Sequence, residues 1–434
     1  MRVLHFSTFD NDGGAARGSL WLHRALRAEG IDSLMMVGRK KSDDASILPL
    51  PHLADRLAAK LRGRLDAAPL LRYDKTDDAF WTLGWLPARI SHIVEEVDPD
   101  VVHLHWIGAG FLPIDALKRI GRPLVWTLRD MWPLTGGCHY TAGCERYRQG
   151  CGACPQLGSA RETDISRKLW QRKERSWAGL NLHLAPISGW LADCVQASPL
   201  LRDFPREIVP NGLDAGKFRP TEKRLARRAW GLPADKRIVL YGAVNATQDR
   251  RKGFPELLTA LDRFGKTDKA RDTLLVVFGD LEPADMPDIG IETRYVGYVG
   301  DDDRLALLYS CADVAVMPSL QEAFGKTLIE AMACGTPVVA FASGGPLDIV
   351  DHRHNGYLAE AFSPDDLAAG IAWCLERRNI GDDPGARARA KVEAEFDIQV
   401  VARRYAALYE RSMGRIDEPS RPVHGRRRRG AAAE

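Results

Sequence analysis

The sequence predicts an α/β protein made of two doubly wound domains that face each other across a cleft. The chain has 434 residues, more than one hydrophobic core usually serves at roughly 150 residues per domain. Short apolar runs alternate with stretches of helical spacing, as in parallel sheets that carry helices on both faces. The alternation stops at a Pro- and Gly-rich segment near the middle and then begins again, which indicates two domains.

The first domain is predicted over residues 1–213. The run VLHFST has the character of a buried strand, AARGSLWLHRALRAEG has helical spacing until Gly30 ends it, and IDSLMMVG is a second strand. Further buried-strand candidates are DVVHLHW, PLVWTL, LHLAPIS and REIVP.

The second domain is predicted over residues 214–415, where PNGLDAGKFRP forms the linker. A closing helix is expected from about Phe396, and the basic tail 416–434 is expected to be disordered. Two such sheets in tandem leave a cleft between the carboxyl ends of their strands, where open α/β sheets bind ligands. The strand candidates of this domain are RIVLYGAV, TLLVVFGD, TRYVGYV, DVAVMPS and TPVVAFA.

Composition limits the classes of function. The apolar content of 45% and the charged content of 27% are ordinary for a globular protein, and the net charge of +3 is too small to indicate nucleic-acid binding. The start MRVLHFSTFD lacks the features of a secretory signal, and no run reaches about 18 apolar residues. We therefore expect a cytoplasmic protein, at most in contact with the inner face of the cytoplasmic membrane.

The stretch MPSLQEAFGKTLIEAMACGTPVV carries the strongest chemical signal. A strand is expected to end near Pro318, and a helix is expected from Phe324 to Cys334. The unpaired amides of its first turn, together with Gly325, suit a diphosphate. Glu322 and Glu330 would bracket that anion site and accept hydrogen bonds from hydroxyls. Taken alone, two such side chains would more often be a first-turn acid and a solvated helix glutamate.

The surroundings favour the functional interpretation. The stretch resembles the signature of two glutamates separated by seven residues in retaining GT-B glycosyltransferases, often called family 4. GGAAR, PNGLD, RKGF, ASGGPLDIV and NGYLAE stand in the same order as in that family. The resemblance covers the chain from Val3 to about Tyr409 and implies the GT-B fold, with two Rossmann-like domains and the acceptor on the first.

The resemblance also implies roles for individual residues. Glu322 would hold donor-sugar hydroxyls, Glu330 the ribose, and Lys252 the diphosphate. The family often has an arginine where this chain has Ala243, so Arg250 or Arg251 would replace it, and Arg129 stands where many members have a sugar-binding histidine, with His105 as another contributor. The residues we assign to catalysis are Glu322, Lys252, Arg251 and Arg129, and those we assign to donor binding are Gly13, Gly14, Tyr298, Phe324, Gly325, Lys326, Thr327 and Glu330.

The implied reaction is the retaining transfer of a hexose-type sugar from a nucleotide sugar to a surface polysaccharide or a lipid-linked oligosaccharide. It implies a front-face route that needs no metal. The triplet Asp301-Asp302-Asp303 is better explained as a helix cap than as a cation site. A GT-B epimerase, a phosphorylase and a non-enzymatic zinc-knuckle protein remain alternatives.

Four cysteines lie within the loop 136–158. Cys138, Cys144, Cys151 and Cys154 include one pair with a two-residue gap, and four sulfurs match tetrahedral zinc. We therefore predict a structural zinc site that shapes the acceptor side of the cleft. Free thiols, a redox pair and an iron–sulfur cluster remain alternatives.

The stretch HLADRLAAKLRGRLDAAPLLRY predicts a basic amphipathic helix. Its leucines recur every four residues, which suits either an anionic membrane and a lipid-linked acceptor or packing against the first domain. The run RRRR in the tail would assist membrane contact by its charge. These residues are Leu53, Leu57, Leu61 and Leu65, flanked by Arg56, Lys60, Arg62 and Arg64.

Overall fold

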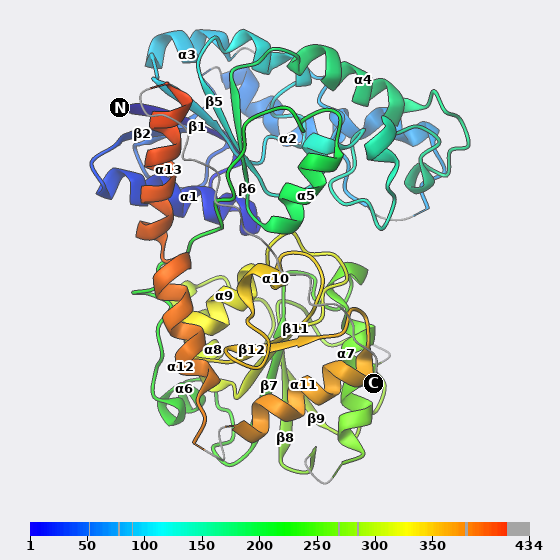
Figure 1. Cartoon of the computed structure of the whole chain (residues 1–434), viewed down its shortest axis with the longest axis vertical. Coiled ribbons are helices and arrows are strands. Elements are labelled where there is room, and N and C mark those ends of the chain that lie inside the picture. Colours follow the sequence, from blue (N-terminus) through cyan, green and yellow to red (C-terminus); the bar gives the residue numbers. More distant parts are fainter. Residues whose placement is uncertain are drawn as a thin grey trace.

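The buried apolar runs form two separate parallel sheets, stacked along the long axis of the computed structural model (Figure 1). The structure describes residues 1–414 except 52, 77–78, 89, 268–269, 284–285 and 378–380. The tail predicted to be disordered, including the RRRR run, lies outside the described residues.

The first sheet contains the strands predicted around VLHFST, IDSLMMVG, DVVHLHW, PLVWTL and LHLAPIS. Its strands are β1 (Arg2–Phe9), β2 (Asp32–Arg39), β3 (Ile47–Pro49), β4 (Val101–Leu104), β5 (Leu124–Leu128) and β6 (Leu182–Pro186), in the order β3-β2-β1-β4-β5-β6. The segments between and after these strands contain the helices α1 (Gly13–Ala28), α2 (Leu53–Ala67), α3 (Ser91–Val97), α4 (Ile165–Trp177) and α5 (Gly189–Ala197). The prediction of a strand at REIVP is wrong, because this segment only runs beside β6 with a single bridge, Leu184 to Arg206.

The second sheet contains all five predicted strands of its half of the chain and one more. Its strands are β7 (Arg237–Gly242), β8 (Thr273–Phe278), β9 (Glu292–Tyr295), β10 (Val314–Met317), β11 (Val338–Phe341) and β12 (Gly356–Ala359), in the order β12-β11-β10-β7-β8-β9. Its helices are α6 (Lys223–Ala229), α7 (Phe254–Gly265), α8 (Asp302–Cys311), α9 (Lys326–Ala333), α10 (Pro346–Ile349), α11 (Pro364–Arg377) and α12 (Pro384–Lys391). The predicted class, two doubly wound α/β domains, is confirmed.

The last helix among the described residues returns to the first domain. This helix, α13 (Ile398–Ser412), follows α12 upward along one side of the molecule and packs against α1 (Figure 1). The chain passes between the two domains twice, near Leu213 and near Ile398, and these two segments lie side by side. Leu213 N donates to Phe396 O at 3.0 Å, and Ile398 N donates to Leu213 O at 2.9 Å. Helix α13 lies within the range 214–415 that we assigned to the second domain, but its side chains fill the core of the first.

Strand order determines which loops meet. β7 and β10 are neighbours in the second sheet, so the segments that follow them emerge side by side at its carboxyl edge. β1 and β4 occupy the same position in the first sheet. Among the described residues, no helix is both long and apolar enough to cross a bilayer.

Candidate active site

Helix α9 begins at a glycine in the left-handed region. Gly325 is its N-cap with φ 112°, and a Cβ there would lie 2.9 Å from the Met317 methyl carbon. The helix therefore starts at Lys326, two residues later than predicted, and ends at Ala333, one residue earlier than predicted. Cys334 is its C-cap, before Gly335, which has φ 73°. The amides of its first two residues, Lys326 and Thr327, are left for a ligand or water, whereas Leu328 N donates to Gly325 O at 3.0 Å.

Lys252 and Glu322 form a salt bridge between the segments that follow the neighbouring strands β7 and β10. Lys252 Nζ donates to Glu322 Oε2 at 2.9 Å, and the two side chains are 20% and 15% exposed. Burial raises the pKa of Glu322, but attraction to Lys252, their hydrogen bond and nearby Arg251 outweigh it and hold the pKa below its ordinary value. The site therefore contains an ionised carboxylate beside an ammonium group.

The loop that carries Lys252 packs closely against the segment that follows β10. Gly253 has φ 70°, and a Cβ on it would lie 1.8 Å from the Pro318 carbonyl oxygen. Leu320 N also donates to Arg251 O at 2.8 Å. The loops after β7 and β10 thus fix each other.

Arg251, rather than Arg250, faces the cleft. Arg250 turns away to Glu256, with a 2.7 Å hydrogen bond. Arg251 pairs with Asp249 at 2.6 Å, and its guanidinium carbon lies 4.1 Å from the centre of the Tyr140 ring of the first domain. Burial, followed by the nearby Glu322 carboxylate, raises the pKa of Tyr140.

Glu330 and Lys326 lie deeper, on the inner face of α9. Glu330 is 3% exposed, so the alternative of a solvated helix glutamate is wrong. It accepts a hydrogen bond from Tyr309 Oη at 2.8 Å and lies 3.6 Å from Lys326 Nζ. Lys326 Nζ also lies 3.8 Å from the centre of the Trp21 ring of α1. Burial lowers the pKa of Lys326 to about 8, although Glu330 opposes this shift.

The other predicted donor residues fall in three different environments. Gly13 and Gly14 open α1, with no atom within 4 Å of a Cβ placed on either, so backbone is accessible there. Thr327 Oγ1 contacts Met317 Sδ at 3.1 Å, and Phe324 is 2% exposed against Phe396, so Phe324 can offer a ligand only its backbone. Tyr298 is 73% exposed in the loop after β9. The donor roles of these residues remain predictions.

Arg129 is buried below the cleft against a polar network of the first domain. It donates to Asn211 Oδ1, and its Nη2 lies 3.5 Å from His105 Nδ1. A Cβ on Gly18 would approach the Arg129 guanidinium to 2.9 Å, so α1 packs directly over it. Burial lowers the pKa of Arg129.

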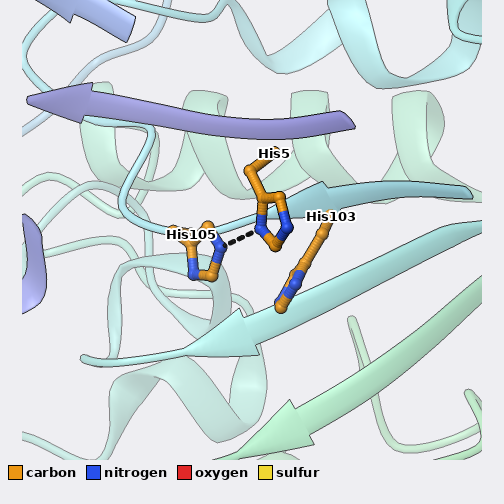
Figure 2. A group of neighbouring side chains, drawn as sticks. All are labelled: His5, His103 and His105. Carbon is orange, nitrogen blue, oxygen red and sulfur yellow. Dashed lines mark hydrogen bonds between the residues drawn. The ribbon is translucent and has the colours of Figure 1, made fainter. Parts of the chain in front are cut away.

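His105 belongs to a group of three buried histidines (Figure 2). His5 Nδ1 and His105 Nε2 are 2.8 Å apart, and both nitrogens of His103 are hydrogen-bonded, to Tyr409 Oη at 2.6 Å and to Thr127 Oγ1 at 2.7 Å. Burial lowers the pKa of all three well below the ordinary value, so the rings are neutral. Although their nitrogens lie within 4.8 Å of one another, these bonds and the adjacent Arg129 cation favour a positioning network over a cation site.

Sequence reasoning missed the contacts between the domains. Arg17 of α1 pairs with Asp302 at the start of α8, whereas Asp301 caps that helix, as predicted, by accepting from Arg304 N at 2.8 Å. Ala142 N in the cysteine-rich loop donates to Gln321 Oε1 at 3.2 Å. The four-residue spacing of Arg17 and Trp21 places both on one face of α1, but nothing in the sequence identifies their partners in the second domain.

The four cysteines of the loop 136–158 line one small pocket. Gly136 N donates to Cys151 Sγ at 3.2 Å, and His139 is engaged elsewhere, by Asp130 at 2.7 Å and Thr82 at 2.9 Å. Burial raises the pKa of Cys151 to about 12 and of Cys154 to about 11.

Comparisons with known proteins agree with this geometry. Residues 222–391 match the family model described as glycosyl transferases group 1. A D-inositol 3-phosphate glycosyltransferase of Thermobispora bispora is 26% identical over 444 residues, which cover 95% of this chain and 94% of that protein.

Solved structures extend the likeness to the whole fold. Sucrose-phosphate synthase from Thermosynechococcus elongatus has a TM-score of 0.68 at 20% identity, covering 95% of this chain and 99% of that one. Anabaena HepE in complex with UDP-glucose has a TM-score of 0.62 at 19% identity, covering 95% and 100%. By fold and site, the protein is a glycosyltransferase of the GT-B class. The match to the glycosyl transferases group 1 family model lies within its second domain.

Proposed function

We propose that this chain is a retaining glycosyltransferase that moves a hexose-type sugar from a nucleotide-sugar donor to a surface-glycan or lipid-linked acceptor. The observation that carries the proposal is the Lys252–Glu322 pair beside the free amides of α9, at the carboxyl edge of the second sheet. One cation, one carboxylate and a helix N-terminus supply what a sugar joined to a diphosphate requires. HepE, which shares the fold, was solved with UDP-glucose.

The diphosphate would take over Lys252 and the first amides of α9, leaving Glu322 to accept hydrogen bonds from sugar hydroxyls. Lys326, held 3.6 Å from Glu330, supplies a second cation for the same phosphates. Glu330 would accept hydrogen bonds from the ribose hydroxyls. Arg251 adds positive charge at the mouth, where Tyr140 limits its movement.

The proposed chemistry is a front-face substitution at the anomeric carbon. The bond from that carbon to the diphosphate oxygen breaks, a bond to the acceptor oxygen forms on the same face, and the acceptor proton passes to the departing diphosphate. The protein contributes orientation and stabilises the leaving charge through Lys252, Lys326 and the helix amides. This route uses cationic side chains in place of a catalytic metal.

The first domain offers a separate pocket for the acceptor. It lies at the carboxyl ends of β1 and β2 beside α2, and Phe9, Arg39, Lys60, Arg64 and Phe111 are among its lining residues. Aromatic faces with cationic neighbours suit a sugar that carries phosphate or carboxylate. The Thermobispora relative is named for a phosphorylated acceptor, D-inositol 3-phosphate.

A donor panel tests the proposal. UDP-, GDP- and ADP-sugars are compared by thermal shift and by slow hydrolysis, in the presence and absence of a chelator. One base is expected to raise the melting temperature of the wild type. The Lys252→Ala variant should bind that donor at least about tenfold more weakly, because a charge-assisted phosphate contact is worth roughly 1.5–3 kcal/mol.

Arg250→Ala is the matched control, since Arg250 stands in the same turn but pairs with Glu256 outside the cleft. Its donor affinity should equal that of the wild type. The anomeric configuration of the transferred sugar, read by NMR, should match that of the donor. Absence of protection by any nucleotide sugar, or an inverted product, would contradict the proposal.

A further inference from the structure

The cysteine-rich loop brings its four thiols to one place from well-separated positions. Cys138 follows the short helical turn after β5, Cys144 and Cys151 flank the next turn, and Cys154 lies just before α4, yet all four line the same pocket. Cys138 and Cys154 are buried, and Cys144 and Cys151 are partly buried.

The backbone around Cys151 and Cys154 is shaped to point both sulfurs inward. Gly150, Cys151, Gly152 and Ala153 have φ values of 94°, 58°, 97° and 39°, so four successive residues take the left-handed region. The turn is anchored on the start of α4, where Gly152 N donates to Ser166 Oγ at 2.9 Å and Cys154 N donates to Asp164 Oδ2 at 2.8 Å. Two non-glycine residues are held in a conformation that they avoid unless something gained there outweighs the strain.

The polar groups next to the sulfurs suit anionic ligands. Gly136 N–H points at Cys151 Sγ, a bond typical of metal-bound thiolate. Lys173 of α4 is 0% exposed and donates to the carbonyls of Trp132 and Thr135, with the latter bond at 2.9 Å. Within the part of the chain that the structure describes, Lys173 forms no salt bridge with a carboxylate. Four thiolates around a dication carry two net negative charges, so such a centre would supply the missing counter-charge.

We propose that Cys138, Cys144, Cys151 and Cys154 bind one structural zinc ion. Soft thiolate ligands in a set of four select zinc in a closed tetrahedral site. Among the described residues, only the three histidines bring three ligand atoms within 4.8 Å of one another, so zinc would draw the sulfurs closer around their pocket. Closure of this kind couples binding to local folding.

The ion would stabilise the part of the first domain that touches the donor site. Between Cys138 and Cys144 the loop carries Tyr140, whose ring covers Arg251, and Ala142, which donates to Gln321 beside Glu322. Zinc therefore acts as a positioning element, without contact to substrate. This coupling rests on the proposed function, whereas the presence of the metal does not.

Metal content is the direct test. Elemental analysis of the full-length wild-type protein, purified without added metal, is expected to show about one zinc per chain. Cobalt exchanged into the protein should give the visible absorption of a tetrahedral thiolate site. No bound zinc, bound iron in its place, or a disulfide between two of these cysteines found by alkylation and mass spectrometry would overturn the proposal.

The variants extend the test. Cys151→Ser/Cys154→Ser should lose the zinc, whereas Cys374→Ala, which alters a buried thiol on α11 away from the loop, should retain it. If the double variant fails to fold, the metal content of the wild type still decides the proposal. If the double variant is soluble, its Michaelis constant for the donor should rise several-fold. A variant that has lost zinc but keeps an unchanged Michaelis constant would overturn the positioning role of the ion. That result would leave the proposed glycosyltransferase activity intact.

Discussion

Among single residues, Lys326 is the cation of the candidate site whose charge is most sensitive to burial. It lies between the Trp21 ring and Glu330, and burial lowers its pKa to about 8. Its ammonium group is therefore present at neutral pH in the free enzyme and is lost as the pH rises through about 8.

This titration predicts opposite effects on activity and stability. The kcat/KM for the donor should fall above about pH 8, because kcat/KM reports ionisations of the free enzyme and the diphosphate then meets a neutral amine. The pKa of Lys326 in the folded protein lies below its value of about 10.4 in the unfolded chain. Between these two pKa values the unfolded state binds more protons than the folded state. The contribution of Lys326 to stability therefore rises with pH over this interval.

Lys326→Arg is the control for that profile. A guanidinium stays charged throughout the range, so the decline in kcat/KM above about pH 8 should disappear, whereas the lysine enzyme keeps it. A wild-type profile that stays flat to about pH 9.5 would show that Lys326 does not serve the donor.

The sequence predicted part of this residue set. The motif resemblance named Glu322, Glu330 and Lys252, and strand order explains why Lys252 meets Glu322. Tyr140 could not be named, because its contact with Arg251 depends on the path of a loop without regular structure and on how closely the two domains approach. Arg129 was named from the resemblance, but its place among buried histidines and under α1 follows from packing alone.

Among the elements, α2 and the turn after it expose apolar side chains next to basic ones. Leu61 is 55% exposed, Leu65 50% and Leu71 89%. The side chains of Leu53 and Leu57, which completed the predicted apolar stripe, lie outside the described residues. Leu61 and Leu65 are therefore not buried by packing against the first domain, and membrane contact of this helix remains a prediction.

Vesicle binding tests this inference for α2. The wild type should sediment with vesicles that contain an anionic lipid and not with zwitterionic ones. Leu61→Ser/Leu65→Ser should weaken binding at least about tenfold, since each leucine inserted into the interface is worth on the order of 1 kcal/mol or more.

Leu225→Ser is the matched control, because Leu225 is 58% exposed on α6 of the second domain and should be neutral. Equal binding by the double variant, or no binding to anionic vesicles by the wild type, would contradict a membrane-facing α2.

Short elements explain the errors at this scale. β3 has only three residues, Ile47–Pro49, so its pattern is too brief to separate from a loop. β12 was missed because GYLA lies inside a segment interpreted as a motif. REIVP looks like a strand because it does run along β6, yet it lacks the regular ladder. Long periodic segments such as α1 and α7 give no such difficulty.

In the whole molecule, the two domains meet through an ion pair that borders the candidate site, since Arg17 lies over the same Trp21 ring as Lys326. Arg17 and Asp302 are 19% and 16% exposed, and Lys217 Nζ lies 3.7 Å from the same carboxylate. The pair joins α1 to α8, and we expect it to favour this arrangement of the two domains. The sequence could not show this, since the partners are far apart in the chain and no local pattern links them.

A charge exchange measures that contribution. Arg17→Asp should raise the Michaelis constant for the donor roughly five- to tenfold, because a partly buried pair contributes about 1 kcal/mol and its replacement adds repulsion. Arg17→Asp/Asp302→Arg should recover most of the loss and return the radius of gyration in solution scattering to the wild-type value.

Arg24→Asp is the matched control, as Arg24 on the same helix pairs with Asp44 inside the first domain, at 3.5 Å. Its donor constant should be unchanged. Absence of recovery in the exchanged double variant would show that the pair does not govern closure.

The path of the chain through α13 also determines the order in which the protein can be made. The chain leaves the first domain at Leu213 and re-enters it at Ile398, and only then do Tyr405 and Tyr409 reach the hydroxyl of Thr127 and the ring of His103. Because synthesis runs from the N-terminus, the second domain is complete on the ribosome while one face of the first sheet still lacks its cover. The domain that is translated first therefore cannot complete its core until α13 emerges.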